Sequence, residues 1–206
     1  MVLLMTVATA VCGGSWSSVA LVFVASAAGQ ATVGWTNDMH DAVADHAAGR
    51  TNKPTVRGEL RPDDLRLPIL ASATLTIPLS FAAAGWVGGT AHIAAVASAL
   101  TYNLFLARTV WSWLPYAVSF ALMPLFVAHA SSPTLWPTSP VVALSVVIGI
   151  TAHLLNAIPD IDIDREIGWG GLAVSLGKKR STVLVAALIL VGAVCLGVVV
   201  NDLLNP

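Results

Sequence analysis

Long runs of apolar residues, interrupted by two strongly polar segments, form the dominant pattern along this 206-residue chain. A helix that crosses the hydrocarbon core of a bilayer needs about 20 mostly apolar residues. A shorter run at about 1–12 ends at Gly13-Gly14 and is too short to cross comfortably. The longer runs predict six full spans, at about 15–36, 67–87, 90–107, 110–128, 138–157 and 182–200.

Polar or small residues mark the predicted breaks between successive spans. Gly88-Gly89, Arg108 and the stretch 129–133 divide the long apolar region between the two polar segments. The pattern has the period of helices and the length of bilayer crossings. We therefore expect an all-α, polytopic transmembrane helical bundle of about six or seven spans, folded as a single domain over residues 1–206.

The composition supports a membrane protein over a soluble one. Hydrophobic residues make up 56% of the chain and charged residues 10%, against roughly 25% charged in ordinary soluble domains. The mean hydropathy is +0.80. We therefore predict an integral, multi-pass membrane protein whose main partner is the lipid bilayer. The net charge of −1 gives no reason to expect a nucleic-acid partner.

Almost all of the charge falls into two segments, residues 38–66 and 160–180. Of the 11 acidic residues only Asp202 lies outside them, and of the 10 basic residues only Arg108 does. An even number of predicted crossings separates the two segments, so both segments and Arg108 should face the same side. The excess of Lys and Arg on that side predicts that it is cytoplasmic.

The first segment begins with closely spaced carboxylates, Asn37-Asp38-x-x-Asp41-x-x-x-Asp45. On a helix that leaves the membrane, residues three and four apart share one face, so the three aspartates should stack. Stacked carboxylates repel one another, and a hard cation relieves that repulsion. Mg²⁺ binds few carboxylates and takes substrate phosphates for much of the rest of its shell. The spacing therefore predicts a magnesium site, with the Asn37 amide at its rim.

The second segment repeats this chemistry after a helix break. Asp160 and Asp164 are four residues apart, and with His153 and Asn156 they form a polar stripe. Pro159 removes one backbone hydrogen bond and favours a kink. A broken helix is tolerated at membrane depth where its polar groups line a cavity. We therefore expect these side chains to face the interior of the bundle.

Basic residues follow each acidic run. Arg50, Lys53 and Arg57 come after the first, and Arg165 and the run 178–180 come after the second. Lys and Arg can neutralise the part of a diphosphate that metal ions leave uncovered. The alternative is that these are ordinary juxtamembrane cations that set the topology.

At this point the motifs resemble those of the UbiA-type intramembrane prenyltransferases. The match rests on Asn37-Asp38-x-x-Asp41-x-x-x-Asp45, on Asp160-x-x-x-Asp164 and on Leu176-Gly177 with the bases that follow it. The resemblance implies a helical bundle around a central cavity open to the cytoplasmic face. It also implies a prenyl diphosphate donor bound through Mg²⁺, ionisation of its allylic C–O bond, and transfer of the prenyl group to an aromatic or other lipophilic acceptor.

The resemblance assigns roles to individual residues. The residues expected to hold the metal and act in catalysis are Asp38, Asp41, Asp45, Asp160 and Asp164. The residues expected to bind substrate are Asn37, Lys53, Arg57, Asn156 and Lys178. Four aromatic side chains are candidates for stabilising an allylic cation through their faces: Tyr102, Trp111, Trp113 and Tyr116.

Three other functions stay open at this stage. A terpene cyclase of the same family would act on a prenyl diphosphate without an acceptor. A cation-binding or transport protein would use the aspartates as ion sites, although it would be expected to place them near the bilayer midplane. A truncated, inactive relative is the third, because the chain has fewer predicted spans than the usual eight or nine and is expected to lack part of the first and last helices.

Overall fold

The computed structural model describes residues 1–47, 49, 51 and 53–205, and over these residues every regular element is helical. The elements are α1 Val2–Val11, α2 Trp16–Ala47, α3 Arg66–Thr101, α4 Trp113–Ser131, α5 Ser139–Ala157, α6 Ile161–Glu166, α7 Leu172–Leu176 and α8 Lys178–Leu204. Short 3₁₀-helices occur at Pro62–Leu65 and Ile158–Asp160, and a short π-helix occurs at Tyr102–Leu106. The predicted all-α class is confirmed.

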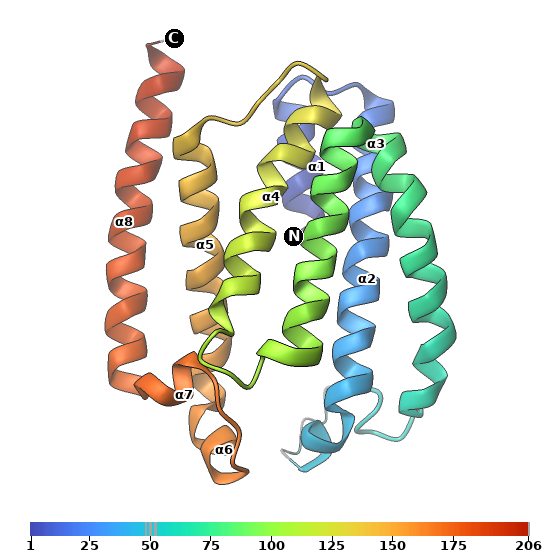
Figure 1. Cartoon of the computed structure of the whole chain (residues 1–206), viewed down its shortest axis with the longest axis vertical. Helices are drawn as coiled ribbons and strands as arrows, with labels where there is room; N and C mark the ends of the chain where they lie inside the picture. The colour runs from blue at the N-terminus through green and yellow to red at the C-terminus, as the bar shows by residue number, and fades with distance from the viewer. Residues whose placement is uncertain (48, 50, 52, 206) are drawn as a thin grey trace.

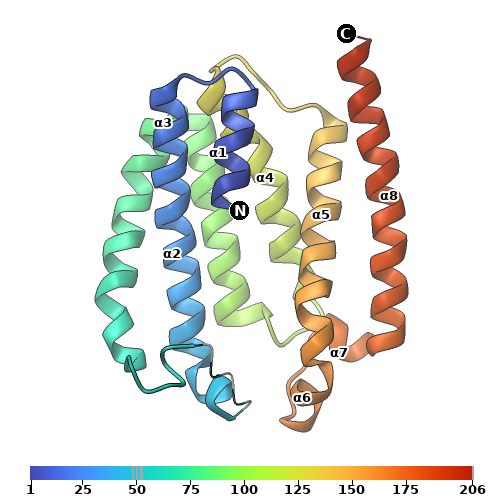
Figure 2. The ribbon, with the colours of Figure 1, turned by 180° about the vertical axis from the view of Figure 1, so that it is seen from behind.

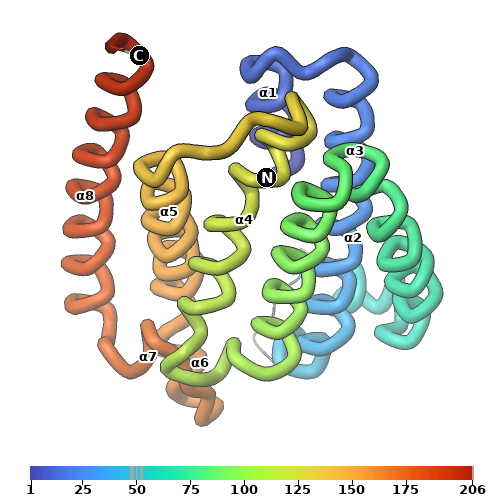
Figure 3. The backbone as a smooth tube through the Cα atoms, turned by 45° about the horizontal axis from the view of Figure 1, so that its top comes forward, coloured from blue at the N-terminus to red at the C-terminus, as the bar shows by residue number. Residues whose placement is uncertain are grey.

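The long helices lie side by side in one bundle, and the short helices α6 and α7 lie at one of its ends (Figures 1 and 2). The short α1 packs against α2 and α4, whereas α8 lies at the edge of the bundle against α5 (Figure 3). In the described part of the chain, five helices are long and apolar enough to cross a membrane, with α1 as a shorter apolar helix.

The long apolar segment around α3 doubles back on itself. Its two limbs are joined at Ala84 and Gly85, which have non-helical dihedral angles (Figure 1). Gly85 has φ +61° and ψ −163°, a backbone conformation that essentially only glycine adopts without strain. We expected this break at Gly88-Gly89, so the predicted position was wrong. Those two glycines are helical and allow close packing, because a Cβ at Gly88 would lie 2.8 Å from the His129 Cβ and one at Gly89 would lie 2.6 Å from Phe81 Cδ1.

Small and hydroxyl side chains hold the helices close together. In lipid, association depends on close packing and interhelical hydrogen bonds, because the tails are as apolar as the helices. Val22, Ala25 and Phe126 are fully buried, and Thr32 donates a 2.8 Å hydrogen bond to Ser72 across α2 and α3. Near the other edge, Ile161 is fully buried in a cluster with Leu154. That contact anchors α6, and with it the second acidic segment, beneath α5.

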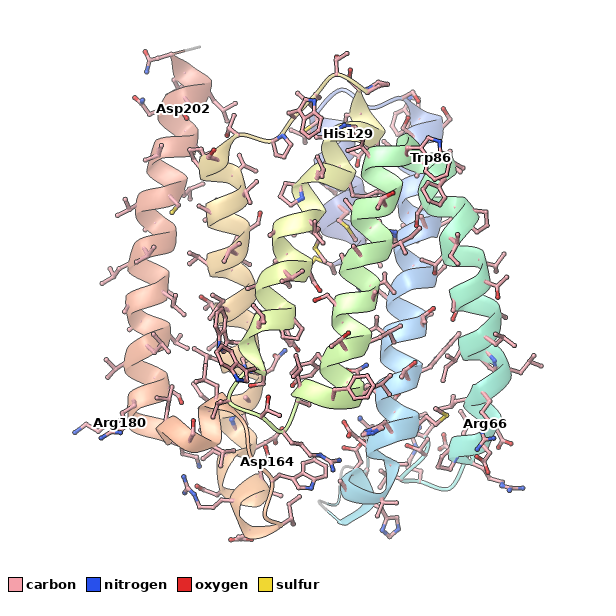
Figure 4. The ribbon with its side chains drawn as sticks, viewed as in Figure 1. Arg66, Trp86, His129, Asp164, Arg180 and Asp202 are labelled. Carbon is pink, nitrogen blue, oxygen red and sulfur yellow. The ribbon has the colours of Figure 1, made fainter. Side chains whose placement is uncertain are left out.

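The charged groups gather at one end of the bundle. Figure 4 places Arg66, Asp164 and Arg180 at this end and Trp86, His129 and Asp202 at the opposite end. The first acidic segment lies on the last turns of α2, at the same end as α6 (Figure 1). The two acidic segments are therefore at one end of the molecule, as the even number of crossings predicted. The side of the membrane that this end faces stays a prediction.

Candidate active site

An apolar cavity of about 260 Å³ lies between α2, α3, α4 and α5. Its walls include the side chains of Val33, Phe120 and Met123. A few polar groups interrupt this apolar lining: Gln30, Tyr102, Asn103, Tyr116, Ser119 and Asn156. Tyr102 and Tyr116 meet edge to face, with ring centroids 5.1 Å apart. A mainly apolar chamber with a few fixed polar groups is the usual form of a site for a lipophilic ligand.

A second pocket, of about 320 Å³, lies closer to the charged end. His40, Val43 and Ala44 of α2 line one side, and Arg108, Ile167 and Trp169 line the other. Along α2, Gln30 and Val33 of the first cavity and His40 and Ala44 of the second recur at helical spacing, with Asn37 between them. Residues at such intervals share a face, so the two pockets follow one another along the same side of α2.

Lys53 organises two of the three aspartates on α2. Its ammonium lies 2.8 Å from Asp38 Oδ1 and 2.6 Å from Asp45 Oδ2. Asp45 is only 2% exposed, so this carboxylate is held away from water. Partial burial by itself lowers the pKa of Lys53, but its hydrogen bonds and charge attraction with Asp38 and Asp45 outweigh that effect and raise the pKa above its ordinary value.

Asp41 is directed to a different partner. Its Oδ1 lies 3.7 Å from the Arg108 guanidinium and 3.4 Å from His40 Nδ1. The three carboxylates lie on one helix at the predicted spacing. Their partners differ, because Asp38 and Asp45 share the Lys53 ammonium whereas Asp41 lies near Arg108 in the loop after α3.

The second acidic segment is built from a broken helix, as Pro159 predicted. The α-helix ends at Ala157, a tighter turn covers Ile158–Asp160, and α6 begins at Ile161. Asn156 lies four residues before Asp160 and lines the apolar cavity. The Asp164 carbonyl accepts a 2.7 Å hydrogen bond from the amide of Trp169, which lines the second pocket. The fold thus brings the second acidic segment to the same end of the bundle as the first (Figure 1).

The predicted substrate-binding residues have different surroundings. Asn156 lines the cavity, and Asn37 is half-buried between the two pockets. Lys178 lies 2.6 Å from Asp162, and Arg57 makes two hydrogen bonds to Glu59, with all four of these side chains largely exposed. Arg50 lies outside the described residues.

His153, predicted to belong to the polar stripe of α5, lies behind the cavity wall. It is 2% exposed, and its Nε2 is 3.0 Å from the Ser112 hydroxyl. Its ring lies 5.0 Å from the Tyr116 ring, which does line the cavity. Of the four aromatic candidates, Tyr102 and Tyr116 belong to this lining and the two tryptophans do not.

Arg108 and Trp169 were missed as site residues by the sequence analysis. The Arg108 guanidinium carbon lies 3.7 Å from the centre of the Trp169 ring, and both residues line the second pocket. One signal was present, because Arg108 is the single basic residue outside the two charged segments. Its isolation between two apolar spans predicts topology but gives no partner.

The donor set around Lys53 suits a hard divalent cation. Among the described residues, no group of three or more His, Cys, Asp or Glu side chains is close enough to hold an ion. Asp38 and Asp45, however, already converge on one cationic group, the Lys53 ammonium. Oxygen donors from a few carboxylates, completed by water and phosphate, are what Mg²⁺ accepts. The residues present therefore fit the ion.

The fold and the site together define a class of protein. This is an all-helical integral membrane protein with a mainly apolar chamber and with carboxylates from two segments at one end of the bundle. Such an arrangement suits a ligand with an apolar tail and an anionic head that is bound through cations.

Comparison with known proteins gives the family. A family model described as the UbiA prenyltransferase family matches residues 1–205, and the chain belongs to this family. The resemblance inferred from the two aspartate motifs is thus confirmed. A search of curated proteins gave no match.

Two solved structures share the fold. Both are of a UbiA homolog from Archaeoglobus fulgidus, one bound to GPP and Mg²⁺ and the other to DMAPP and Mg²⁺. Each is 19% identical to this chain and superposes with a TM-score of 0.78. Each match covers 94% of this chain and 71% of the other.

Proposed function

We propose that this protein is a Mg²⁺-dependent intramembrane prenyltransferase that ionises a prenyl diphosphate and transfers the prenyl group to a lipophilic acceptor. The observation that carries the proposal is that the two acidic segments meet at one end of the bundle beside an apolar cavity. Asp41 is linked through Arg108 and Trp169 to Asp164, and Asn156, four residues before Asp160, lines the cavity. Family membership supports the reaction class. The Archaeoglobus homolog, bound to GPP or DMAPP with Mg²⁺, supports the donor and the metal.

The aspartates are assigned to the metal. Asp38, Asp41 and Asp45 would hold it from α2, and Asp160 and Asp164 would hold it from the second segment. Bound there, Mg²⁺ supplies charge neutralisation of the departing diphosphate. Lys53 lies between Asp38 and Asp45, so its ammonium must change partner when the ion binds, and the adjacent diphosphate is the new partner that we assign to it.

The remaining polar groups are assigned to the anionic head of the donor. Lys53 and Arg108 neutralise charge that the metal leaves uncovered, and the Asn37 and Asn156 amides can donate hydrogen bonds to diphosphate oxygens. Preorganised donors of this kind stabilise charge as it develops on the leaving group. Arg57 pairs with Glu59 and Lys178 pairs with Asp162. To bind diphosphate, each base must leave this carboxylate partner.

The cavity is assigned to the prenyl chain. Val33, Phe120 and Met123 provide an apolar wall that excludes water from the allylic carbon. Tyr102 and Tyr116 line the same cavity, with their rings edge to face against each other. The negative face of an aromatic ring stabilises a nearby cation, and this is the role we assign to the two rings during ionisation.

The test is diphosphate release from dimethylallyl, geranyl, farnesyl and geranylgeranyl diphosphates by purified protein, with and without Mg²⁺. We expect metal-dependent release, reduced by about 100-fold or more in Asp41→Ala and Asp164→Ala, because each removes charge-stabilising oxygens at the reacting end. Asp202→Ala is the matched control, since Asp202 lies at the opposite end of the bundle. The proposal is wrong if the wild type releases no diphosphate from any of these donors.

The same assay separates the remaining alternatives. A prenyl hydrocarbon formed without added acceptor would identify a cyclase instead of a transferase. Ion transport is not favoured by the structure, because both acidic segments lie at one end of the bundle and not at mid-depth (Figures 1 and 4).

A further inference from the structure

The loops after α3 and after α6 are locked together at the second pocket, although they are far apart in sequence. A Cβ at Gly170 would clash with the Arg108 carbonyl oxygen, so only glycine allows this approach. The Ser112 hydroxyl accepts a 3.2 Å hydrogen bond from the Leu172 amide and lies 3.0 Å from His153 Nε2. Ser112 is fully buried, so this junction is part of the packed interior.

The junction places a cation between the two acidic segments. The Arg108 guanidinium carbon lies 3.7 Å from the centre of the Trp169 ring, which places a cation over an aromatic face. One of its nitrogens lies 3.7 Å from Asp41 of the first segment. Trp169 is tied to the second segment, because its amide donates a 2.7 Å hydrogen bond to the Asp164 carbonyl. A continuous chain of contacts therefore runs from Asp164 through Trp169 and Arg108 to Asp41.

Arg108 differs from the other bases near the site in how it is held. Lys53 and Lys178 each approach a carboxylate at 2.6 Å, and Arg57 makes two short hydrogen bonds to Glu59. Among the described residues, the charged partner of Arg108 is Asp41, at the longer distance of 3.7 Å. Stacking occupies the face of a guanidinium and leaves its N–H donors at the edge, where they can bind an anion.

We propose that Trp169 is a positioning residue that holds the Arg108 guanidinium at the second pocket, where its edge binds the diphosphate of the donor. This inference rests on the proposed function. Trp169 itself touches no reacting atom in this scheme. Its indole face and its backbone link to Asp164 set the direction of the Arg108 side chain, so that the cation is in place before the donor arrives.

The test measures binding of inorganic diphosphate with Mg²⁺ by calorimetry, and the kinetics of donor turnover, for four variants of the full chain. Arg108→Gln should weaken diphosphate binding by about 10-fold or more, because a charge-assisted contact is lost. Trp169→Leu should weaken diphosphate binding by about 2- to 5-fold, as expected for a partly exposed cation–aromatic contact. It should raise the KM for the donor by a similar factor. Trp169→Phe should recover most of the binding, because it keeps an aromatic face. The double variant Arg108→Gln/Trp169→Leu should bind no worse than Arg108→Gln.

Trp86→Leu is the control for removal of a large aromatic side chain, because Trp86 lies at the opposite end of the bundle (Figure 4). Thermal unfolding of each variant separates loss of positioning from loss of fold. Additive effects in the double variant, or equal loss in Trp169→Phe and Trp169→Leu, would overturn the proposal. Wild-type binding of diphosphate with no change in Trp169→Leu would reject this inference alone, whereas no wild-type binding of any donor would reject the proposed function and this inference with it.

Discussion

At the scale of single residues, the geometry of the first acidic segment depends on Lys53. Without a cation between them, the carboxylates of Asp38 and Asp45 would repel each other across two turns of α2. The Lys53 ammonium contacts both, at 2.8 and 2.6 Å, and it does so in a largely buried setting where the attraction is only partly screened. It therefore holds the two carboxylates close together.

We predict that Lys53→Met lowers the free energy of unfolding by about 1–3 kcal/mol, because the buried Asp45 carboxylate loses a charged partner. The pKa of Lys53 is raised above 10.5 in the fold. The contribution of Lys53 to stability is thus complete below pH 10.5 and is lost as the pH rises through the folded-state pKa. Thermal unfolding in detergent, followed by circular dichroism at pH 7 and at pH 11, measures both effects.

Lys178→Met is the matched control for this experiment. Lys178 makes an ion pair of the same 2.6 Å length, but with Asp162, which is 60% exposed. Solvent screens such surface pairs, so its removal should change stability by no more than about 0.5 kcal/mol. Equal losses in the two lysine variants would contradict the role assigned to Lys53.

At the scale of helices, the cavity depends on how closely α4 and α5 approach each other. Gly149 of α5 permits this contact, because a Cβ there would lie 2.8 Å from both the Phe120 Cβ and the Tyr116 carbonyl oxygen. Tyr116 and Phe120 also line the cavity. The missing side chain at Gly149 thus determines both the packing of the two helices and the position of the cavity wall.

We predict that Gly149→Ala destabilises the protein by about 1–3 kcal/mol, because the added methyl group overpacks the interface between α4 and α5. The displaced wall should also raise the KM for the longest accepted donor more than for dimethylallyl diphosphate. Gly197→Ala in α8 is the control, since nothing lies within 4 Å of a Cβ at that position. It should be neutral or slightly stabilising through helix propensity, and a matching loss at Gly197 would argue against the packing explanation.

At the scale of the whole molecule, charge is segregated to one end of an apolar bundle. Arg66, Asp164 and Arg180 lie at this end of the bundle (Figure 4). Asp202, near the end of α8, lies at the opposite end. The excess of Lys and Arg predicts that the charged end faces the cytoplasm. Donor diphosphate would then enter from the cytoplasmic side, where charged metabolites are soluble.

The predicted cytoplasmic orientation can be tested with single cysteines. They are introduced after both native cysteines, Cys12 and Cys195, are replaced by alanine. A membrane-impermeant maleimide should label Thr134→Cys in intact cells, and it should label Leu60→Cys only after lysis. Both positions are exposed, Leu60 before α3 and Thr134 in the loop between α4 and α5. The reversed labelling pattern would place the aspartates outside the cell.

Much of the fold and the outline of the site could be predicted from local sequence. The spans follow from runs of apolar residues, because the thickness of the bilayer and the need to satisfy backbone hydrogen bonds leave helices as the way to cross. Asp41 and Asp164 could be assigned to one end because an even number of crossings separates them. The break in α3 was predicted at Gly88 and occurs at Gly85, because glycine has two roles in this segment. Gly85 provides the turn, whereas Gly88 permits close helix packing.

The pairing of side chains at the site was decided only by the tertiary structure. Spacing along α2 grouped Asp38, Asp41 and Asp45 together, but the loops that follow α2 and α3 bring different cations to them. Arg108 meets Trp169 because two distant loops pack at Gly170. Hydropathy and helical period are properties of neighbouring residues and can be read from the chain. A contact between distant loops depends on the packing of the whole bundle, and no local pattern records it.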